Sequence, residues 1–293
     1  MKHKLSPYDV AKCFIVLFLT IMALLAILPF IHVVALSMSG YVASEANLVG
    51  ILPVDLDFKA WKKVLSDATL RKSLVVTVKR VMLGVPLTLL VSIPAAYVLS
   101  FDKKAFPMRT LYVGFFLVPM FVSGGLVPAY ILMKQLKLID TIWALVLPGT
   151  AATSVLILLL NFFRGIPREI REAAEIDGAS DFQLLWRIFI PLGMPCIITI
   201  AMFSTINHWN SWFDGVVYIR DVNRYPLQTY VHSMLKSLDS MKIGMQDMTE
   251  AVTVSRKTIK AAYTVFAVVP VALVYPILQK HVKGGLVVGS VKG

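Results

Sequence analysis

The segment Glu172-Ala-Ala-Glu-Ile-Asp-Gly178-Ala-Ser-Asp181 lies between two long apolar runs and leads into Ile190-Pro191. Its pattern is that of a polar helix–turn–helix set within an otherwise apolar chain. Pro167 suits the first turn of a helix, because the N–H that proline lacks would have no intrahelical partner there. The pattern therefore predicts a helix that ends near Ile176, with Gly178 supplying the left-handed conformation of the cap.

A second short helix is expected directly after this cap. Ser180 followed by Gln183 matches a capping box, and the helix would carry Phe182 and Trp186 before Pro191 stops it. The two helices predict an elbow, residues 165–191, on which a soluble partner docks. An interfacial hairpin lying on lipid is the alternative, but anionic headgroups would repel so acidic a segment. Its acidic residues are Glu169, Glu172, Glu175, Asp177 and Asp181.

The chain around the elbow has the composition of a membrane protein. Of its 293 residues, 57% are hydrophobic and 16% are charged, whereas a soluble chain carries about a quarter of charged residues. Six apolar runs are long enough to cross about 30 Å of hydrocarbon, and all 17 acidic residues lie outside them. We expect an all-α membrane protein with one transmembrane domain, residues 1–293, and an outer loop at 214–260. The six runs are 13–36, 74–99, 110–133, 141–163, 192–213 and 261–279.

Charge favours one orientation of these spans. The formal net charge is +12, but no basic run exceeds two residues, which argues against a nucleic-acid partner. The short segment 100–109 carries Lys103, Lys104 and Arg109 against Asp102 alone, and short basic loops face the cytoplasm. We therefore expect both termini and the elbow to be cytoplasmic. Lys79-Arg80 is expected to lie at a membrane interface or to snorkel and receives no role.

The end of the fifth run, residues 207–214, is polar and aromatic for a membrane span. Amides and indole rings suit the hydroxyls and C–H faces of a sugar, and polar groups within a span usually face the bundle interior. An outer aromatic belt and hydrogen bonding between helices remain open as alternatives. The histidines and cysteines show no metal-ligand spacing and no catalytic arrangement is evident, so we expect no metal site and no enzymatic activity. The candidate substrate-pathway residues are Asn207, Trp209, Asn210 and Trp212.

The segment Glu172-Ala-Ala, with Asp177-Gly178-Ala179 and Ile190-Pro191, resembles the EAA loop of ATP-binding-cassette (ABC) importer permeases. The preceding Asn161–Ile170 segment, Trp209-Asn210 and the glycine-rich end 283–293 are similar to the carbohydrate-uptake, maltose-type branch. The resemblance implies a type I importer permease with six transmembrane helices and a cytoplasmic coupling helix in the elbow. It assigns the contact with a cytoplasmic ATPase to six residues: Glu172, Ala173, Ala174, Asp177, Gly178 and Ala179.

The same resemblance implies the partners, the mechanism and a location in a bacterial cytoplasmic (inner) membrane. ATP and Mg²⁺ would bind to two copies of a partner ATPase subunit, with no cofactor on this chain. A second homologous permease would complete the pathway, and an external solute-binding protein would deliver the solute. Closure of the ATPases would move the elbow and switch the pathway between inward-open and outward-open states.

Two questions about function remain open on the sequence. A secondary transporter or channel for a small polar solute, with no ATPase partner, is the rival, although it would normally carry an ionisable coupling residue mid-span. The cargo is expected to be an oligosaccharide. Because the outer loops are mildly basic, an acidic one such as alginate is the narrower expectation.

Overall fold

The computed structural model describes residues 7–240 and 254–286. These residues are helical, and the extended pairing among them is a single antiparallel bridge between Ser39 and Leu56. They divide into two compact units, residues 1–68 with 233–269 and residues 69–232 with 270–293. The all-α expectation is confirmed, whereas the assignment of the whole chain to one domain stays a prediction.

The first unit contains α1, which is apolar on all sides. The spanning window of α1 has none of its residues buried within this chain, as expected of a helix that faces lipid or another subunit. α3 is amphipathic and buries Ala60 and Val64. The helices of this part are α1 (Pro7–Ser37), α2 (Tyr41–Glu45) and α3 (Lys59–Ser66).

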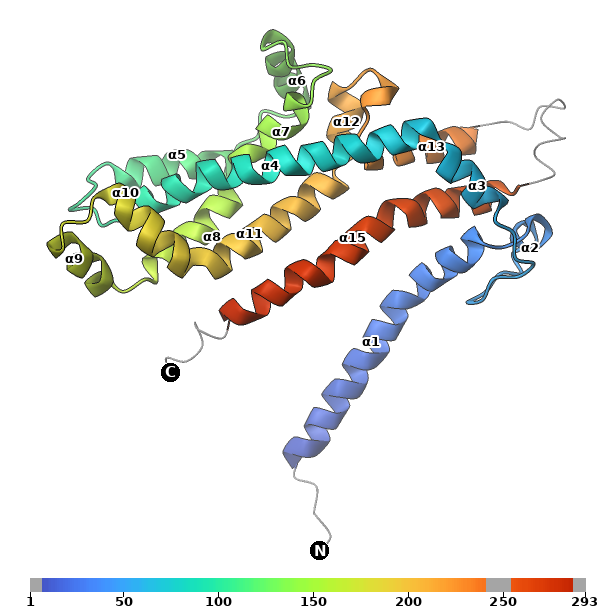
Figure 1. The fold of residues 1–293 in the computed structure, drawn as a ribbon, viewed down its shortest axis with the longest axis horizontal. Coiled ribbons are helices and arrows are strands. Elements are labelled where there is room, and N and C mark those ends of the chain that lie inside the picture. The colour runs from blue at the N-terminus through green and yellow to red at the C-terminus, as the bar shows by residue number, and fades with distance from the viewer. Residues whose placement is uncertain (1–6, 241–253, 287–293) are drawn as a thin grey trace, which may run out of the picture. The chain divides into compact units, whose positions relative to one another are not determined.

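The second unit contains the helices that carry the candidate site (Figure 1). Two expected spans are each built from two helices with a sharp bend between them. α5 and α6 are bent by 116°, and α7 and α8 by 41°. Gly125 lies at the first bend with φ +79°, a conformation that favours glycine, and Pro148 lies near the second bend. The elements are α4 (Ala68–Ser100), α5 (Arg109–Phe121), α6 (Leu126–Gln135), α7 (Trp143–Thr150) and α8 (Thr153–Arg164).

The chain continues through the elbow into the fifth predicted span. The expectation that Pro191 ends the second elbow helix is wrong: α10, a π-helical turn and α11 form one helix from Asp181 to Asn210. Pro191 lies at the start of α11, and the wider π turn before it accommodates a residue that donates no hydrogen bond. α11 also ends at Asn210 rather than near residue 213. These elements are α9 (Arg168–Ile176), α10 (Asp181–Leu184), η1 (Leu185–Phe189) and α11 (Ile190–Asn210).

The predicted outer loop is largely helical in its described part. It contains α12 (Phe213–Tyr218), η2 (Val222–Arg224) and α13 (Leu227–Ser240), and α15 (Arg256–Leu286) follows. Among the described residues, three helices are long and apolar enough to cross a membrane, or five if each bent pair forms one span. The sixth predicted run, 261–279, lies within α15, and the count of six spans stays a prediction.

One apolar core holds α4, α8, α10 and α11 together. Its buried members include Tyr97, Leu159, Phe163 and Ile200. The rings of Phe163 and Phe189 meet edge to face with centroids 5.5 Å apart, a favoured aromatic geometry. The core lies directly behind the elbow and so gives α9 a rigid support.

Candidate functional site

The elbow begins with a helix that has a well-formed C-terminal cap. Pro167 is the N-cap of α9. At its other end the Ala179 N–H donates to the Ala174 carbonyl at 2.9 Å and the Gly178 N–H to the Glu175 carbonyl at 3.1 Å. This pair of bonds is the Schellman motif, and Gly178 has the φ of +78° that the motif requires. The predicted glycine cap is confirmed.

The turn after Gly178 is closed by the predicted capping box. The Ser180 N–H donates to Gln183 Oε1 at 3.0 Å, and the Gln183 N–H donates to Ser180 Oγ at 3.4 Å. The hydroxyl of Tyr97, near the end of α4, donates to Asp181 at 3.4 Å. The second half of the elbow is therefore tied to a long membrane helix.

The two faces of α9 differ in what they contact. Ala174 and Ala179 pack against the apolar core, so the small side chains allow α9 to lie close to it. Glu172, Ala173 and Asp177 are exposed, and Ile176 is 86% exposed. The exposed side of α9 therefore carries acidic side chains and one large apolar side chain.

Ion pairs and an aromatic ring join α9 to the segment after α4. The guanidinium of Arg171 lies 3.8 Å from the ring centroid of Phe101, within the range of a cation–π contact, and Nε donates to Glu175 at 2.6 Å. Arg168 pairs with Asp102 at 3.0 Å. These contacts fix the angle of α9 against the end of α4.

The predicted pathway residues lie at the end of α11, with different exposures. Asn207 and Asn210, one helical turn apart, are exposed, and their side chains have no hydrogen-bond partner among the described residues. Trp209 is buried, with 8% of its surface exposed. Trp212 is 40% exposed and stacks on His232 with ring centroids 4.0 Å apart.

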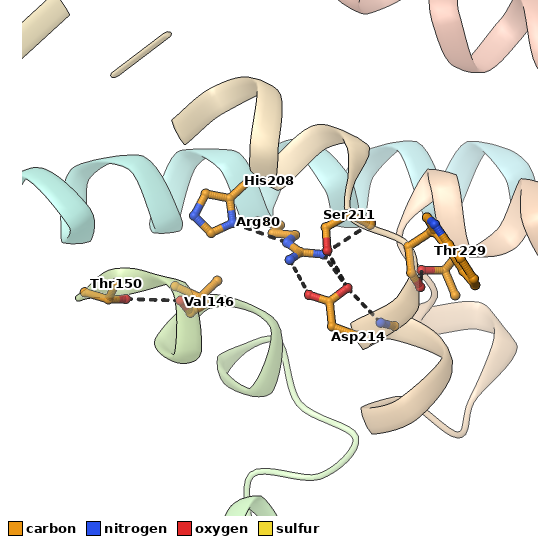
Figure 2. A network of polar contacts seen from close by, with 9 residues as sticks. Arg80, Val146, Thr150, His208, Ser211, Asp214 and Thr229 are labelled. Carbon is orange, nitrogen blue, oxygen red and sulfur yellow. Dashed lines mark hydrogen bonds and ion pairs between the residues drawn. The ribbon is translucent and has the colours of Figure 1, made fainter. Parts of the chain in front are cut away.

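A buried arginine, to which the sequence analysis gave no role, holds this end of α11 in place (Figure 2). Arg80 in α4 is 3% exposed and forms a two-pronged ion pair with Asp214, with Nη1 3.2 Å from Oδ1 and Nη2 on Oδ2. Its Nε donates to His208 Nδ1 at 3.4 Å, and Nη1 donates to the Ser211 carbonyl at 3.5 Å. The expectation that Arg80 snorkels is wrong, because its guanidinium is buried, where Asp214 neutralises its charge and His208 accepts a hydrogen bond from it. A position of Lys79 and Arg80 at a membrane interface stays a prediction.

The carboxylate of Asp214 is satisfied from its other side as well. Its Oδ1 accepts from Ser211 Oγ at 2.8 Å and from the Gly215 N–H at 2.9 Å. Each nitrogen of the Arg80 guanidinium donates a hydrogen bond within this network. None of the three nitrogens therefore needs a ligand as its hydrogen-bond acceptor. The network therefore positions the break between α11 and α12.

Gly84 makes room for the ring of His208, because a Cβ there would collide with the imidazole. α4 thus approaches the His208 ring closely because it lacks a side chain at this position. A Cβ at Gly149 in α7 would lie 3.6 Å from His208 Cε1, an ordinary van der Waals contact. Thr229 fills the corresponding space against Gly215, and its hydroxyl donates to the Trp212 carbonyl at 2.9 Å.

The sequence held a signal for this network. Arg80 is a charge inside the second apolar run, and Asp214 is the acidic residue at the edge of the fifth. Opposite charges at the borders of two spans predict a pair, because an ionised group within a membrane needs a partner. The contact between Arg80 and His208 could not be predicted in this way. It depends on the position of Gly84 in space, which the spacing of residues along the sequence does not give.

A second polar cluster joins the α6–α7 corner to the outer segment. Asp140 accepts from the backbone N–H groups of Arg220 and Asp221 at 3.2 and 3.3 Å, and its carbonyl accepts from Arg224 at 2.8 Å. The N–H and side-chain amide of Asn223 donate to Asp221 and hold the pKa of that carboxyl below its usual value. This cluster fixes the segment that follows α12.

No group of three or more metal-ligating side chains occurs in the described part of the chain. Within the second unit, an exposed helical elbow lies at one end of the apolar helices. At the other end, two amides without a hydrogen-bond partner among the described residues lie near the Arg80–Asp214 ion pair. Such a combination suits a membrane subunit that moves a polar solute and is driven from outside the bilayer.

Comparison with known proteins identifies the class. Residues 84–286 match the family of inner membrane components of binding-protein-dependent transport systems, and the chain belongs to that family. The predicted resemblance to ABC importer permeases is thereby confirmed.

Particular relatives narrow the class further. The polygalacturonan/rhamnogalacturonan transport system permease protein YtcP of Bacillus subtilis is 34% identical over 94% of this chain and 96% of its own length. Protein LplC of the same organism is 36% identical over 95% of this chain and 93% of its own length. A chain from the crystal structure of a bacterial ABC transporter involved in the import of the acidic polysaccharide alginate has a TM-score of 0.84 at 30% identity, covering 95% of this chain and 99% of that one.

Proposed function

We propose that this chain is one of two permease subunits of an ATP-driven importer of oligosaccharides, with acidic oligosaccharides as its cargo. The observation that carries the proposal is the near-complete likeness to a chain of an alginate importer, at a TM-score of 0.84. The relative named for polygalacturonan and rhamnogalacturonan transport supports the same class of cargo. The exposed Lys59, Lys62 and Lys63 on α3 would favour an acidic sugar or its carrier at the outer surface.

The proposed fold is the six-helix, type I permease, with both termini and the elbow in the cytoplasm. α9 would be the coupling helix, held in a cleft of an ATPase subunit that binds ATP and Mg²⁺. The exposed Glu172 and Ala173 and the 86% exposed Ile176 support this role. Because Ala174 and Ala179 pack on the core, a force on α9 would reach α4, α8 and α11 directly.

The proposed solute pathway follows the exposed amides of α11. Asn207 and Asn210 would donate and accept hydrogen bonds with sugar hydroxyls, and Trp212 would offer the face of its indole ring. Trp209 would support them from behind, because its side chain is buried. Arg80 would hold Asp214 and so keep Trp212 at the mouth of the pathway.

Reconstitution of the complex tests the proposal. This chain should co-purify with a second permease and an ATPase, and ATP hydrolysis should rise when a solute-binding protein loaded with a uronic oligosaccharide is added. Equal stimulation by neutral and uronic oligosaccharides, each with its own binding protein, would remove the acidic cargo and leave the importer. Uptake by this chain without any ATPase would overturn the importer itself.

A further inference from the structure

A cavity of about 530 Å³ lies between α9 and the ends of three membrane helices. Its wall comes from the segment after α4, the start of α5, the end of α8 and one face of α9. Because α4 ends at Ser100, α5 begins at Arg109 and α8 ends at Arg164, the cavity lies where the spans leave the hydrocarbon. One of its lining residues, Glu172, also lies on the exposed side of α9, whereas Ile176 does not line the cavity.

The charge of this cavity is positive and unevenly satisfied. Five cationic and three acidic side chains line it, a net charge of +2. Arg168 and Arg171 are paired with Asp102 and Glu175. The side chains of Lys104 and Arg164 also line the cavity, and they form no hydrogen bond or ion pair within the described part of the chain. The cationic lining residues are Lys104, Arg109, Arg164, Arg168 and Arg171.

The cavity is also amphipathic. Phe101, Phe163 and Phe189 line it, and the last two are buried in the apolar core. A lining that combines aromatic rings with cationic side chains matches an amphiphile with an anionic head better than it matches a freely soluble anion. Arginine forks and a lysine point charge are the side chains that recognise phosphate.

We propose that this cavity binds a phosphate anion presented by the headgroup of an anionic phospholipid. Basic pockets between transmembrane helices on the cytoplasmic side are suited to such headgroups. Bound there, the phosphate would neutralise the side chains of Lys104 and Arg164. The proposal rests on the proposed function only for the cytoplasmic side and for the role of α9 in coupling.

The test compares two double variants from which the same charge has been removed. Lys104→Gln with Arg164→Gln removes the unpaired cations of the cavity. Lys103→Gln with Arg187→Gln removes two exposed cations that do not line it. The complete complex is placed in nanodiscs of phosphatidylcholine with or without phosphatidylglycerol, and the phosphatidylglycerol retained after purification is counted by native mass spectrometry.

We expect the cavity variant to bind phosphatidylglycerol about 30-fold more weakly than the wild type, and the control variant to bind it nearly as well as the wild type. An equal loss in both variants, or a loss in neither, overturns the site. A third arm adds inorganic phosphate to nanodiscs of phosphatidylcholine alone. Thermal stabilisation of the wild type but not of the cavity variant by inorganic phosphate would retain the anion site and overturn the lipid as its source.

Oligosaccharide-stimulated ATP hydrolysis is measured on the same samples. If the oligosaccharide stimulates ATP hydrolysis but lipid retention is the same with and without Lys104 and Arg164, the lipid site alone is rejected. If the wild type retains the lipid but the oligosaccharide does not stimulate its ATP hydrolysis, the transport function alone is rejected.

Discussion

The guanidinium of Arg80 in α4 donates a hydrogen bond to each carboxylate oxygen of Asp214 at the start of α12, although the two residues are 134 positions apart in the sequence. Two parallel N–H···O contacts fix orientation as well as distance. The same guanidinium donates to His208 and to the Ser211 carbonyl. α4 therefore sets the angle between α11 and α12 and with it the position of Trp212.

Asp214→Asn should destabilise the protein by about 3–5 kcal/mol, because it leaves the buried guanidinium of Arg80 without its anionic partner. Arg80→Gln should cost less, because the Asp214 side chain that it leaves unpaired is 23% exposed. The complex carrying either variant should unfold at a lower temperature, and its oligosaccharide-stimulated ATP hydrolysis should fall. Thermal unfolding followed by tryptophan fluorescence measures the first effect. An ATPase assay measures the second.

The double variant and a neighbouring lysine supply the controls for this pair. Arg80→Gln with Asp214→Asn should lose less stability than the two single losses combined, because no unpaired charge remains. Lys79→Gln, at an exposed neighbour, should leave stability unchanged within about 0.5 kcal/mol. Additive losses in the double variant would show that Arg80 and Asp214 act separately.

Gly84→Ala should destabilise the protein by about 1–3 kcal/mol, because the new methyl group collides with the ring of His208. Gly114→Ala is the matched control, since a Cβ at Gly114 meets nothing within 4 Å. There the helix should gain up to about 1 kcal/mol. Thermal unfolding of the two variants side by side measures the contrast, and similar unfolding temperatures would mean that His208 moves away at little cost.

The sequence predicted the local structure of the elbow closely, for a physical reason. Helix caps are determined by residues within a few positions of one another. The capping box therefore follows from Ser180 and Gln183 alone, and the C-terminal cap of α9 follows from Gly178. The end of the second elbow helix was mispredicted because the π turn before Pro191 depends on packing around Phe189. A proline read alone signals a stop.

The long-range part of the site could not be read in the same way. Exposure of Asn207 and burial of Trp209 depend on which face of α11 meets the core, and α11 is apolar on most sides. The pairing of Arg80 with His208 depends on the space that Gly84 leaves on α4 for a ring carried by α11. Such contacts are determined by three-dimensional packing, which a hydropathy pattern does not contain.

Substitutions at Gly178 should impair coupling in a graded order. Asparagine tolerates the left-handed conformation, alanine loses about 1–2 kcal/mol in it, and a β-branched valine loses more. We expect oligosaccharide-stimulated ATP hydrolysis to fall from Gly178→Asn to Gly178→Ala to Gly178→Val, with similar amounts of each chain in the membrane. Equal activity of the asparagine and valine variants would show that the φ of +78° at this position has no part in coupling.

Asn207→Ala and Asn210→Ala should lower oligosaccharide uptake without lowering stability. Each side chain is exposed and has no partner among the described residues, so its loss leaves no buried polar group unsatisfied. A lost hydrogen bond to a sugar hydroxyl weakens binding by about 0.5–1.5 kcal/mol, or roughly 3- to 10-fold in uptake rate. Thr205→Val is the control, because that hydroxyl already donates to the Ala201 carbonyl at 2.8 Å within α11 and its uptake should match the wild type. Unchanged uptake by the double variant Asn207→Ala with Asn210→Ala, in proteoliposomes that contain the whole complex, would exclude this face of α11 from the solute pathway.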